Sequence, residues 1–324
     1  MNKRSISIAA LLAAVALLPE LSAAQAYPVK AVRIVVPAQP GGGLDLIGRT
    51  IAGELGRSMG QSFIVENLSG GGGSIASLAA ARATPDGYTL MVGYVGTHGT
   101  NPAVRKLPYD AVKDFTAIAM VGGTPNVLVV NPSVPVADLK GFIDYAKKNA
   151  AKLGYASGGI GTLNHLALEQ FRAVAGLEAV YAHYRGIGPA ITDLLGGQIQ
   201  VLMPGLAAAL PHIRAGKMKP IALTGLKRHP LVPDVPTFEE SGFKGFDGVQ
   251  WYGIVGPAGL PAPIVARLNE EINAMIKSPD MRERLSSEAL EPMPMTPDQF
   301  GQYIRDDIAR WSQLARERNI RITE

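Results

Sequence analysis

The chain has 324 residues, of which 31 are basic and 27 acidic, and it has no cysteine. The lack of cysteine excludes disulfides and thiol catalysis, so a hydrophobic core must provide the stability. About 300 residues are ample to build one or two such cores. The small basic excess comes without runs of Lys and Arg, so we expect no nucleic-acid partner.

The first residues have the order of a secretory signal peptide. A cationic head at residues 3–4 is followed by an apolar run at 6–18 and by small residues with a cleavage box at 24–26. The apolar run is shorter than the ~20 residues that span a bilayer, which argues against a membrane anchor. We therefore expect residues 1–26 to be cleaved and the mature protein to be exported, in a bacterium to the periplasm.

The mature chain alternates short apolar runs with helical patterns, which is typical of an α/β protein. Residues 115–131 differ, because two apolar runs broken at 122–125 have no helix between them. Such an extended segment suits a crossover between domains. Before it, we expect strands at 32–36, 63–66 and 88–92, and helices at 46–59 and 74–82.

A second set of α/β units follows the crossover. Its expected strands are 153–156, 179–182, 199–203 and 220–224, and its expected helices are 136–149, 162–175, 188–195 and 207–215. Residues 227–248 are rich in Pro, Gly and charge and predict an ordered loop with one short helix at 237–241. A return strand at 251–256 and helices at 263–277, 279–287 and 297–318, each opened by a proline, complete the chain.

This order predicts two α/β lobes joined by extended crossover segments. We place lobe 1 at 27–125 and 250–324, and lobe 2 at 126–249. Ligands of open α/β sheets bind beyond the carboxyl ends of the strands. Two lobes that face each other would therefore share a ligand cleft at those ends.

Five loops at the expected strand ends are rich in Gly, Ser and Thr and lead into helices. Glycine lets the backbone approach a ligand, and the first N–H groups of a helix are unsatisfied donors at a partial positive charge. A carboxylate or phosphate fits there, although a tight turn with a helix cap is the alternative for any single loop. The chain has no P-loop, and no Gly-x-Gly-x-x-Gly follows the first strand. The loops are 40–45, 69–74, 96–100, 157–162 and 184–188.

Four side chains in or near these loops are candidate ligand contacts. Arg185 could hold a carboxylate with its planar fork, or form a surface ion pair. His98 and His165 could donate to a carboxylate, or be hydrogen-bonded locally. Trp251 could wall the cleft or pack in the core.

Catalysis and metal binding are weakly supported. His165 and Glu169 could share a helix face as metal ligands, but no third ligand is spaced to join them. No Gly-x-Ser-x-Gly elbow and no acid/base constellation occurs. We therefore expect neither an enzyme nor a bound metal or cofactor.

Motifs spread along the mature chain match one family in order. They include PGGG at 40–43, TPDGYTL at 84–90, LPYD at 107–110, DLLGG at 193–197 and LPHIRAG at 210–216. Through them the chain resembles the receptors of tripartite tricarboxylate transporters, the Bug-type extracytoplasmic solute-binding proteins. The resemblance covers essentially the whole mature chain.

The resemblance implies a type II periplasmic-binding-protein fold that closes on its ligand and delivers it to large and small membrane subunits. We expect the receptor to be a monomer. In this family, the first loop and the second-lobe loops grip one carboxylate, partly through waters. Carried over by position, the gripping residues are Gly42, Gly43, Leu44, Asp45, Ser157, Gly158, Gly161 and Thr162, with Thr97, His98, His165, Arg185 and Gly186 nearby.

Two positions depart from the family pattern. Leu44 stands where Thr or Ser is usual, so a hydroxyl is missing. Pro204 stands where many members have an aspartate that could bind an amino-acid ammonium. The expected function is capture of a small carboxylate-bearing metabolite for a transporter. The alternatives are a receptor that presents its loaded form to a sensor kinase, and a secreted enzyme on the same fold.

Overall fold

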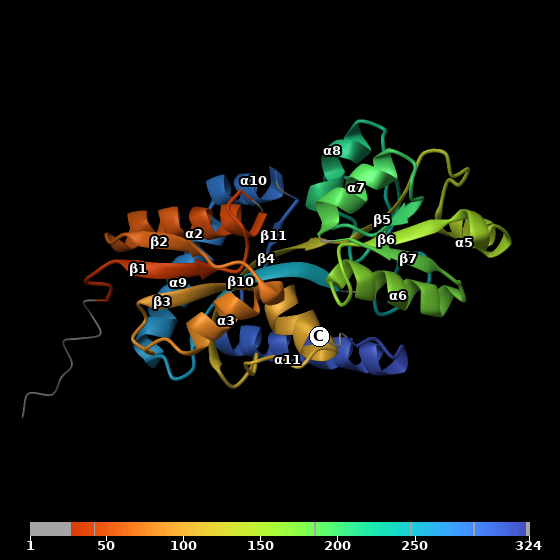
Figure 1. The fold of residues 1–324 in the computed structure, drawn as a ribbon. Helices are drawn as coiled ribbons and strands as arrows, with labels where there is room; N and C mark the ends of the chain where they lie inside the picture. The colour runs from red at the N-terminus through yellow and green to blue at the C-terminus, as the bar shows by residue number, and fades with distance from the viewer. Residues whose placement is uncertain (1–26, 42, 185, 247, 288, 322–324) are drawn as a thin grey trace, which may run out of the picture.

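The computed structural model describes residues 27–41, 43–184, 186–246, 248–287 and 289–321. The predicted signal peptide and two predicted site residues, Gly42 and Arg185, lie outside the described residues. Figure 1 shows two α/β lobes side by side, with extended segments passing between them. The strands form one mixed sheet in each lobe, which confirms the predicted two-lobe α/β fold. Within the described ranges, no helix is long and apolar enough to cross a membrane.

The first lobe is built on a six-stranded sheet. In sheet order, its strands are β11 (Glu291–Pro292), β4 (Phe115–Pro125), β10 (Val249–Pro257), β3 (Thr89–Tyr94), β1 (Val32–Val36) and β2 (Phe63–Asn67). β1 is parallel to β2 and β3, whereas β10 is antiparallel to β3 and β4. The parallel strands β1, β2 and β3 therefore end at the same edge of the sheet.

Helices cover both faces of this sheet. On one face lie α2 (Gly43–Met59), α9 (Ala262–Lys277) and α10 (Pro279–Ser287), and on the other lie α3 (Ser74–Ala81), α4 (Asn101–Val104) and α11 (Pro297–Glu317). Ile34 of β1 packs on the first face and Val35 on the second, as the two-residue period of a strand requires. Both side chains are fully buried, so each face has its own apolar core.

The second lobe has a five-stranded sheet. In sheet order, its strands are β7 (Val180–His183), β6 (Gly154–Ser157), β8 (Val201–Leu202), β5 (Val127–Val130) and β9 (Lys219–Leu223). Its helices are α5 (Leu139–Lys148) and α6 (Leu163–Ala175) on one face, and α7 (Ile187–Leu195) and α8 (Leu206–Arg214) on the other. β6 is parallel to β7 and β8, so these three strands also end at one edge.

Two expectations about local structure are wrong. β4 runs unbroken through residues 122–125, where the glycines predicted a break. A Cβ on Gly122 would lie 2.6 Å from the carbonyl oxygen of Glu291, so the glycine allows β11 to approach rather than ending the strand. Residues 237–241 form a turn and not a helix. Thr237 and Glu240 bond each other's backbone N–H there, as in a helix cap, but no helix follows.

Two segments cross between the lobes and are bonded to each other. β4 passes into β5 with only Asn126 between them, and the chain returns from β9 to β10 through residues 224–248. The backbone N–H of Asn126 donates to the hydroxyl of Thr224 at 2.8 Å, and the N–H of Thr224 donates to the carbonyl of Asn126 at 2.8 Å. Both residues are buried, so these two hydrogen bonds hold the crossing segments together.

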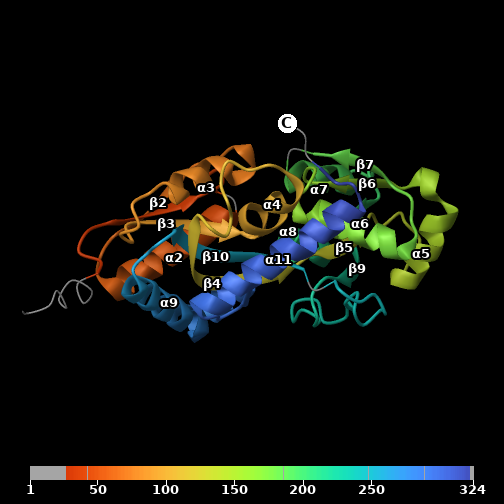
Figure 2. The ribbon, with the colours of Figure 1, turned by 90° about the horizontal axis from the view of Figure 1, so that it is seen from below.

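Helix α11 connects the lobes a second time. Figures 1 and 2 show it running along the first lobe and reaching α6 of the second. Leu163 and Leu166 of α6 pack in the same apolar cluster as Trp251 and Trp311. The cores of the two lobes are therefore continuous at this contact.

One buried carboxylate anchors α11 to the return strand β10. Asp307 accepts hydrogen bonds from the indole N–H groups of Trp251 at 2.9 Å and Trp311 at 3.0 Å, and it pairs with Arg310. Only 3% of its surface is exposed. Asp307 therefore accepts hydrogen bonds from two buried indole N–H groups. Without an acceptor, the burial of these groups would cost free energy.

We predict that Asp307→Ala will lower the free energy of unfolding by about 2–5 kcal/mol, because two buried N–H groups lose their acceptor. Asp306→Ala, at the preceding exposed position, should change it by less than about 0.5 kcal/mol. Scanning calorimetry of the two variants gives the comparison. Equal melting temperatures would contradict the anchoring role.

Candidate ligand-binding site

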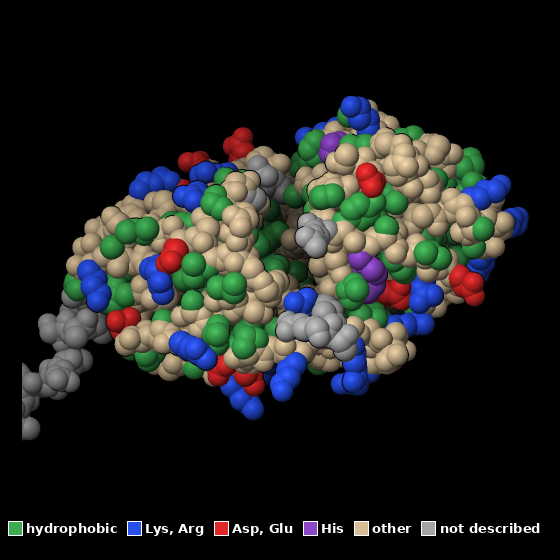
Figure 3. All heavy atoms as spheres, viewed as in Figure 1, with side chains coloured by type: hydrophobic (Ala, Val, Ile, Leu, Met, Phe, Trp, Pro, Cys, Tyr) green, Lys and Arg blue, Asp and Glu red, His purple; other side chains and the backbone are tan. Residues whose placement is uncertain are grey.

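The carboxyl ends of the parallel strands of the two sheets face each other. β1 and β2 of the first lobe point toward the second lobe (Figure 1), and α6 begins close to the first. Figure 3 shows the surface hollowed between the lobes at this place. The loops that follow β1 and β6 therefore lie at the facing edges of the two lobes, beside this hollow.

Asp45 organises the first loop. Its carboxylate accepts hydrogen bonds from the N–H of Gly41 at 2.8 Å, the Nε of Arg49 at 2.9 Å and the Nδ2 of Asn67 at 2.9 Å. These bonds, Arg49 first, lower the pKa of Asp45 to about 2. The carboxylate is thus ionised and occupied by donors of its own loop. The resemblance placed Asp45 among the gripping residues, and the sequence analysis did not select Asn67 of β2 as its partner.

The open part of this loop is its glycine and leucine. Gly43 is exposed, and an added Cβ there would meet no described atom within 4 Å. Leu44 is half-buried and packs against the core beneath α2. The space next to Gly43 at the start of α2 is therefore open, and the apolar side chain of Leu44 borders it.

The first loop of the second lobe is held by its own hydrogen bonds. The N–H of Gly158 donates to Oδ1 of Asn164 at 2.9 Å, and the hydroxyl of Thr162 donates to the carbonyl of Gly159 at 2.6 Å. The N–H of Gly161 donates to Nδ1 of His165 at 3.1 Å. Asn164 was missed by the sequence analysis, although it lies between two residues that were named.

The remaining second-lobe residues extend the same surface. The hydroxyl of Ser157 lies 2.7 Å from Nδ1 of His183, an exposed histidine that the sequence analysis did not select. The N–H of Gly186 donates to the carbonyl of Gly158 at 3.0 Å, which ties two strand-end loops together. Pro204 is buried, and its carbonyl accepts the N–H of Val127 at 2.9 Å. Pro204 therefore lies where a strand end meets the crossing.

Helices that start at this edge lack side-chain caps. No side-chain hydrogen bond caps α3, α6, α7 or α8, whose N-cap residues are Gly73, Thr162, Gly186 and Gly205. Of the helices that begin elsewhere, α5 and α11 are capped by Asp138 and Thr296, whereas α9 also has no side-chain cap. Uncapped first turns leave N–H donors free for an anion.

Thr97 and His98 lie under the cleft surface and not on it. Both are fully buried, and the Thr97 hydroxyl lies 2.8 Å from Nδ1 of His98. The His98 ring meets Phe115 edge-on at 4.6 Å, and burial lowers its pKa to about 3. A Cβ on Gly73 would lie 2.5 Å from the Thr97 methyl, so this pair supports the loop after β2. Burial was the property that sequence alone could not assign.

His165 and Glu169 are neighbours on α6, and each has a partner within its own lobe. Glu169 is paired with Arg172 at 2.9 Å. Burial, and next the nearby His183, lower the pKa of His165 to about 4. The described residues contain no group of three or more possible ligands around a metal site. The neutral His165 ring instead accepts a bond from its own loop.

Trp251 belongs to the core. It has no exposed surface, and its ring meets Phe300 edge-on at 5.6 Å. Of the two roles considered from the sequence, core packing is the one that its position fits.

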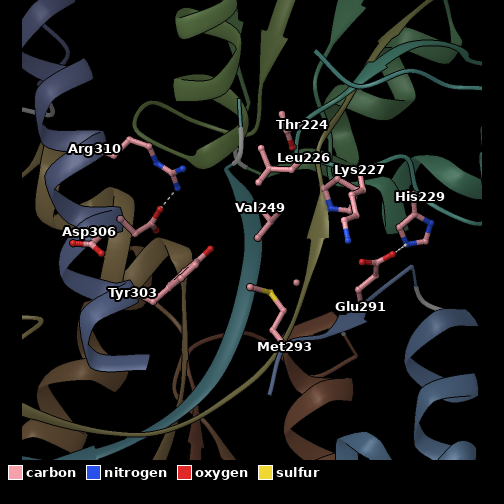
Figure 4. Close-up of a pocket in the computed structure, with 14 residues that line it drawn as sticks. Thr224, Leu226, Lys227, His229, Val249, Glu291, Met293, Tyr303, Asp306 and Arg310 are labelled. Atoms are coloured by element: carbon pink, nitrogen blue, oxygen red, sulfur yellow. Dashed lines mark hydrogen bonds and ion pairs between the residues drawn. The ribbon is translucent and has the colours of Figure 1, made fainter. Parts of the chain in front are cut away.

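A separate pocket of about 550 Å³ borders the crossing strands. Figure 4 shows Tyr303 and Arg310 of α11 on one side, and Lys227, His229 and Glu291 on the other. None of the glycine-rich strand-end loops lines it. The pocket is therefore distinct from the shared cleft.

Comparison with known proteins assigns the chain to a family. The family model described as "Tripartite tricarboxylate transporter family receptor" matches residues 47–320. Protein BugT of Bordetella pertussis is 33% identical over 300 residues, which cover 91% of each chain. The solved structure of R. palustris Rpa4515 with adipate is 33% identical, has a TM-score of 0.83, and is matched over 91% of this chain and 99% of that one.

A further solved relative has the same two-lobe form. MatC (Rpa3494) from Rhodopseudomonas palustris with bound malate is 34% identical and has a TM-score of 0.77, over 89% of this chain and 99% of that one. A match over most of the chain, together with these relatives, agrees with the motifs and the fold. This chain belongs to the tripartite tricarboxylate transporter receptor family, whose solved relatives are periplasmic solute-binding proteins.

Proposed function

We propose that this protein is exported to the periplasm, captures a small carboxylate in the shared cleft, and delivers it to a tripartite membrane transporter. The observation that carries the proposal is the set of uncapped helix starts at the facing strand-end edges of the two lobes. Each helix start stabilises an exposed anion by only about 0.3–1 kcal/mol, so several must act on one ligand. Lobe 1, residues 27–125 and 250–324, would close on lobe 2, residues 126–249.

The relatives support a carboxylate rather than another anion. Rpa4515 was solved with adipate and MatC with malate. In the present chain, Gly43, Ser157, Gly158, Gly161, Thr162 and Gly186 would form the grip, with Leu44 and Pro204 at its border. Gly42 and Arg185 join this set on sequence grounds alone.

The two competing functions have less support. Asp45 is engaged by three donors and His98 is fully buried, so an enzyme would have to use the exposed His183 beside the Ser157 hydroxyl. The family and its solved relatives are binding proteins, which favours binding over catalysis. A receptor for a sensor kinase would use the same cleft, so only the membrane partner distinguishes it. Membership of a transporter receptor family favours delivery to a transporter.

We predict that at least one organic acid will raise the melting temperature of the purified protein with 1:1 stoichiometry. At a hundredfold excess over Kd, the stabilisation should approach about 2.7 kcal/mol. A thermal-shift screen of mono-, di- and tricarboxylates, with sugars and peptides as the comparison set, measures this. Stabilisation by sugars or peptides and by no acid would refute the carboxylate proposal.

We predict that Gly43→Val will weaken binding of that acid at least tenfold, or about 1.4 kcal/mol, because its side chain would enter the space in front of α2. Gly53→Val is the matched control. It lies in the same helix, is also exposed, and an added Cβ there also meets nothing within 4 Å. Isothermal titration of both variants tests the site. The same affinity in the two variants would place the ligand elsewhere.

We predict that des-amino acids will bind more tightly than their 2-amino counterparts. A buried ammonium needs a partner, but Pro204 offers no carboxylate and the carboxylate of Asp45 is already bonded to three donors. Titration of succinate against aspartate and of glutarate against glutamate provides the comparison. Tighter binding of the amino acids would reveal another acceptor in the cleft.

A further inference from the structure

Arg105 reaches back from the end of α4 to the glycine loop that follows β2. A Cβ added to Gly72 would lie 3.1 Å from its Nη1 atom and 3.5 Å from its Cζ atom. Asn101, one turn earlier, fixes that loop by donating from Nδ2 to the carbonyl of Gly72 at 2.8 Å. The guanidinium therefore lies against an exposed strand-end loop of the candidate site.

This guanidinium has no anionic partner among the residues that the structure describes. No hydrogen bond or ion pair joins the Arg105 side chain to any described residue, and its Nε is buried without an acceptor. Other partly buried arginines are matched, such as Arg172 with Glu169 and Arg310 with Asp307. A partly buried cation without a counter-charge costs free energy, which an arriving anion would offset.

Arg105 lines two depressions, of which one is positive. Lys106, Arg316 and Arg321 line that depression of about 420 Å³, and none of its described lining residues is acidic, whereas the other, of about 530 Å³, is also lined by Asp110 and Asp114. The turn that precedes α4, η3 (Gly96–Thr100), contacts α6 of the second lobe. Figure 3 shows basic side chains at the lower opening of the hollow between the lobes, near α4.

The geometry points to Arg105 as a specificity-determining residue: we propose that it receives a second carboxylate of the solute and so selects dicarboxylates over monocarboxylates. The inference rests on the proposed function, in which the uncapped helix starts hold the first carboxylate. The planar fork of Arg matches a carboxylate with two parallel hydrogen bonds, which a lysine cannot reproduce. Arg105 thus adds selectivity to a grip that recognises any carboxylate.

The test compares acids of equal chain length that differ by one carboxylate: succinate with butanoate, adipate with hexanoate, and suberate with octanoate. Isothermal titration measures Kd for wild type, Arg105→Gln, Arg105→Lys and the matched control Lys106→Gln. In wild type, at least one dicarboxylate should bind about tenfold or more tightly than its monocarboxylate. Arg105→Gln should reduce that ratio to within about threefold while leaving the monocarboxylate Kd unchanged.

The remaining variants distinguish a direct contact between Arg105 and the ligand from a general electrostatic attraction by nearby positive charge. Arg105→Lys should restore part of the ratio, and Lys106→Gln should keep it at the wild-type value. An unchanged ratio in Arg105→Gln, an equal loss for both acids, or an equal loss in Lys106→Gln would overturn the assignment of Arg105. So would a wild-type protein that prefers monocarboxylates. If folded wild type binds none of the acids, the proposed function itself fails, and that result is distinguishable from all the others.

Discussion

The arrangement of the two lobes depends on the crossing at Asn126 and Thr224. In a buried position, the N–H of Asn126 donates to the Thr224 hydroxyl and the N–H of Thr224 donates to the Asn126 carbonyl, so the outgoing and the returning segments are held together. Val249 also pairs with Pro125 beside them. Because both sheets grow outward from this point, their strand-end edges face each other. A cleft lined by helix starts follows from that constraint, and relative rotation of the lobes must bend the chain at these residues.

The cleft surface is prepared by hydrogen bonds within the protein. Asp45, Asn67 and Asn164 are occupied by the backbone or by side chains of their own loops, which holds the glycine-rich turns in place. Burial lowers the pKa of His98 and of His165, so both rings are neutral near pH 7. In the proposed grip, positive potential would therefore come from helix starts and not from the imidazole rings of His98 or His165. Such a preformed grip loses little entropy when a ligand binds.

Helix α11 adds a second connection that the crossing alone would not provide. Its indole and carboxylate contacts with β10 fix it to the first lobe, while Leu163 and Leu166 of α6 pack into the same cluster. A movement of the lobes must therefore slide or separate this apolar contact. The contact limits the directions in which the cleft can open and close.

The sequence alone determined the local elements and the character of the site. Short apolar runs such as 32–36 and the glycine-rich turns before helices are short-range signals, and most elements lie within three residues of their expected bounds. The same signals located the loops at 40–45 and 157–162. They indicated these loops as the candidate site because, in a parallel α/β sheet, strand ends carry the ligand-binding loops.

Only the tertiary structure decided which side chains face the cleft. His98 lies in another of the glycine-rich loops and Trp251 lies in β10, yet both are fully buried, unlike Gly43. Their burial depends on packing with Phe115 and Asp307, which come later in the chain. Gly122 looked like a strand break because β11, its close neighbour, is almost 170 residues away in sequence. Local sequence patterns carry the propensity for helix, strand and turn. Burial and hydrogen-bond partners depend instead on the order of the strands in the sheets, which is set only when the chain folds.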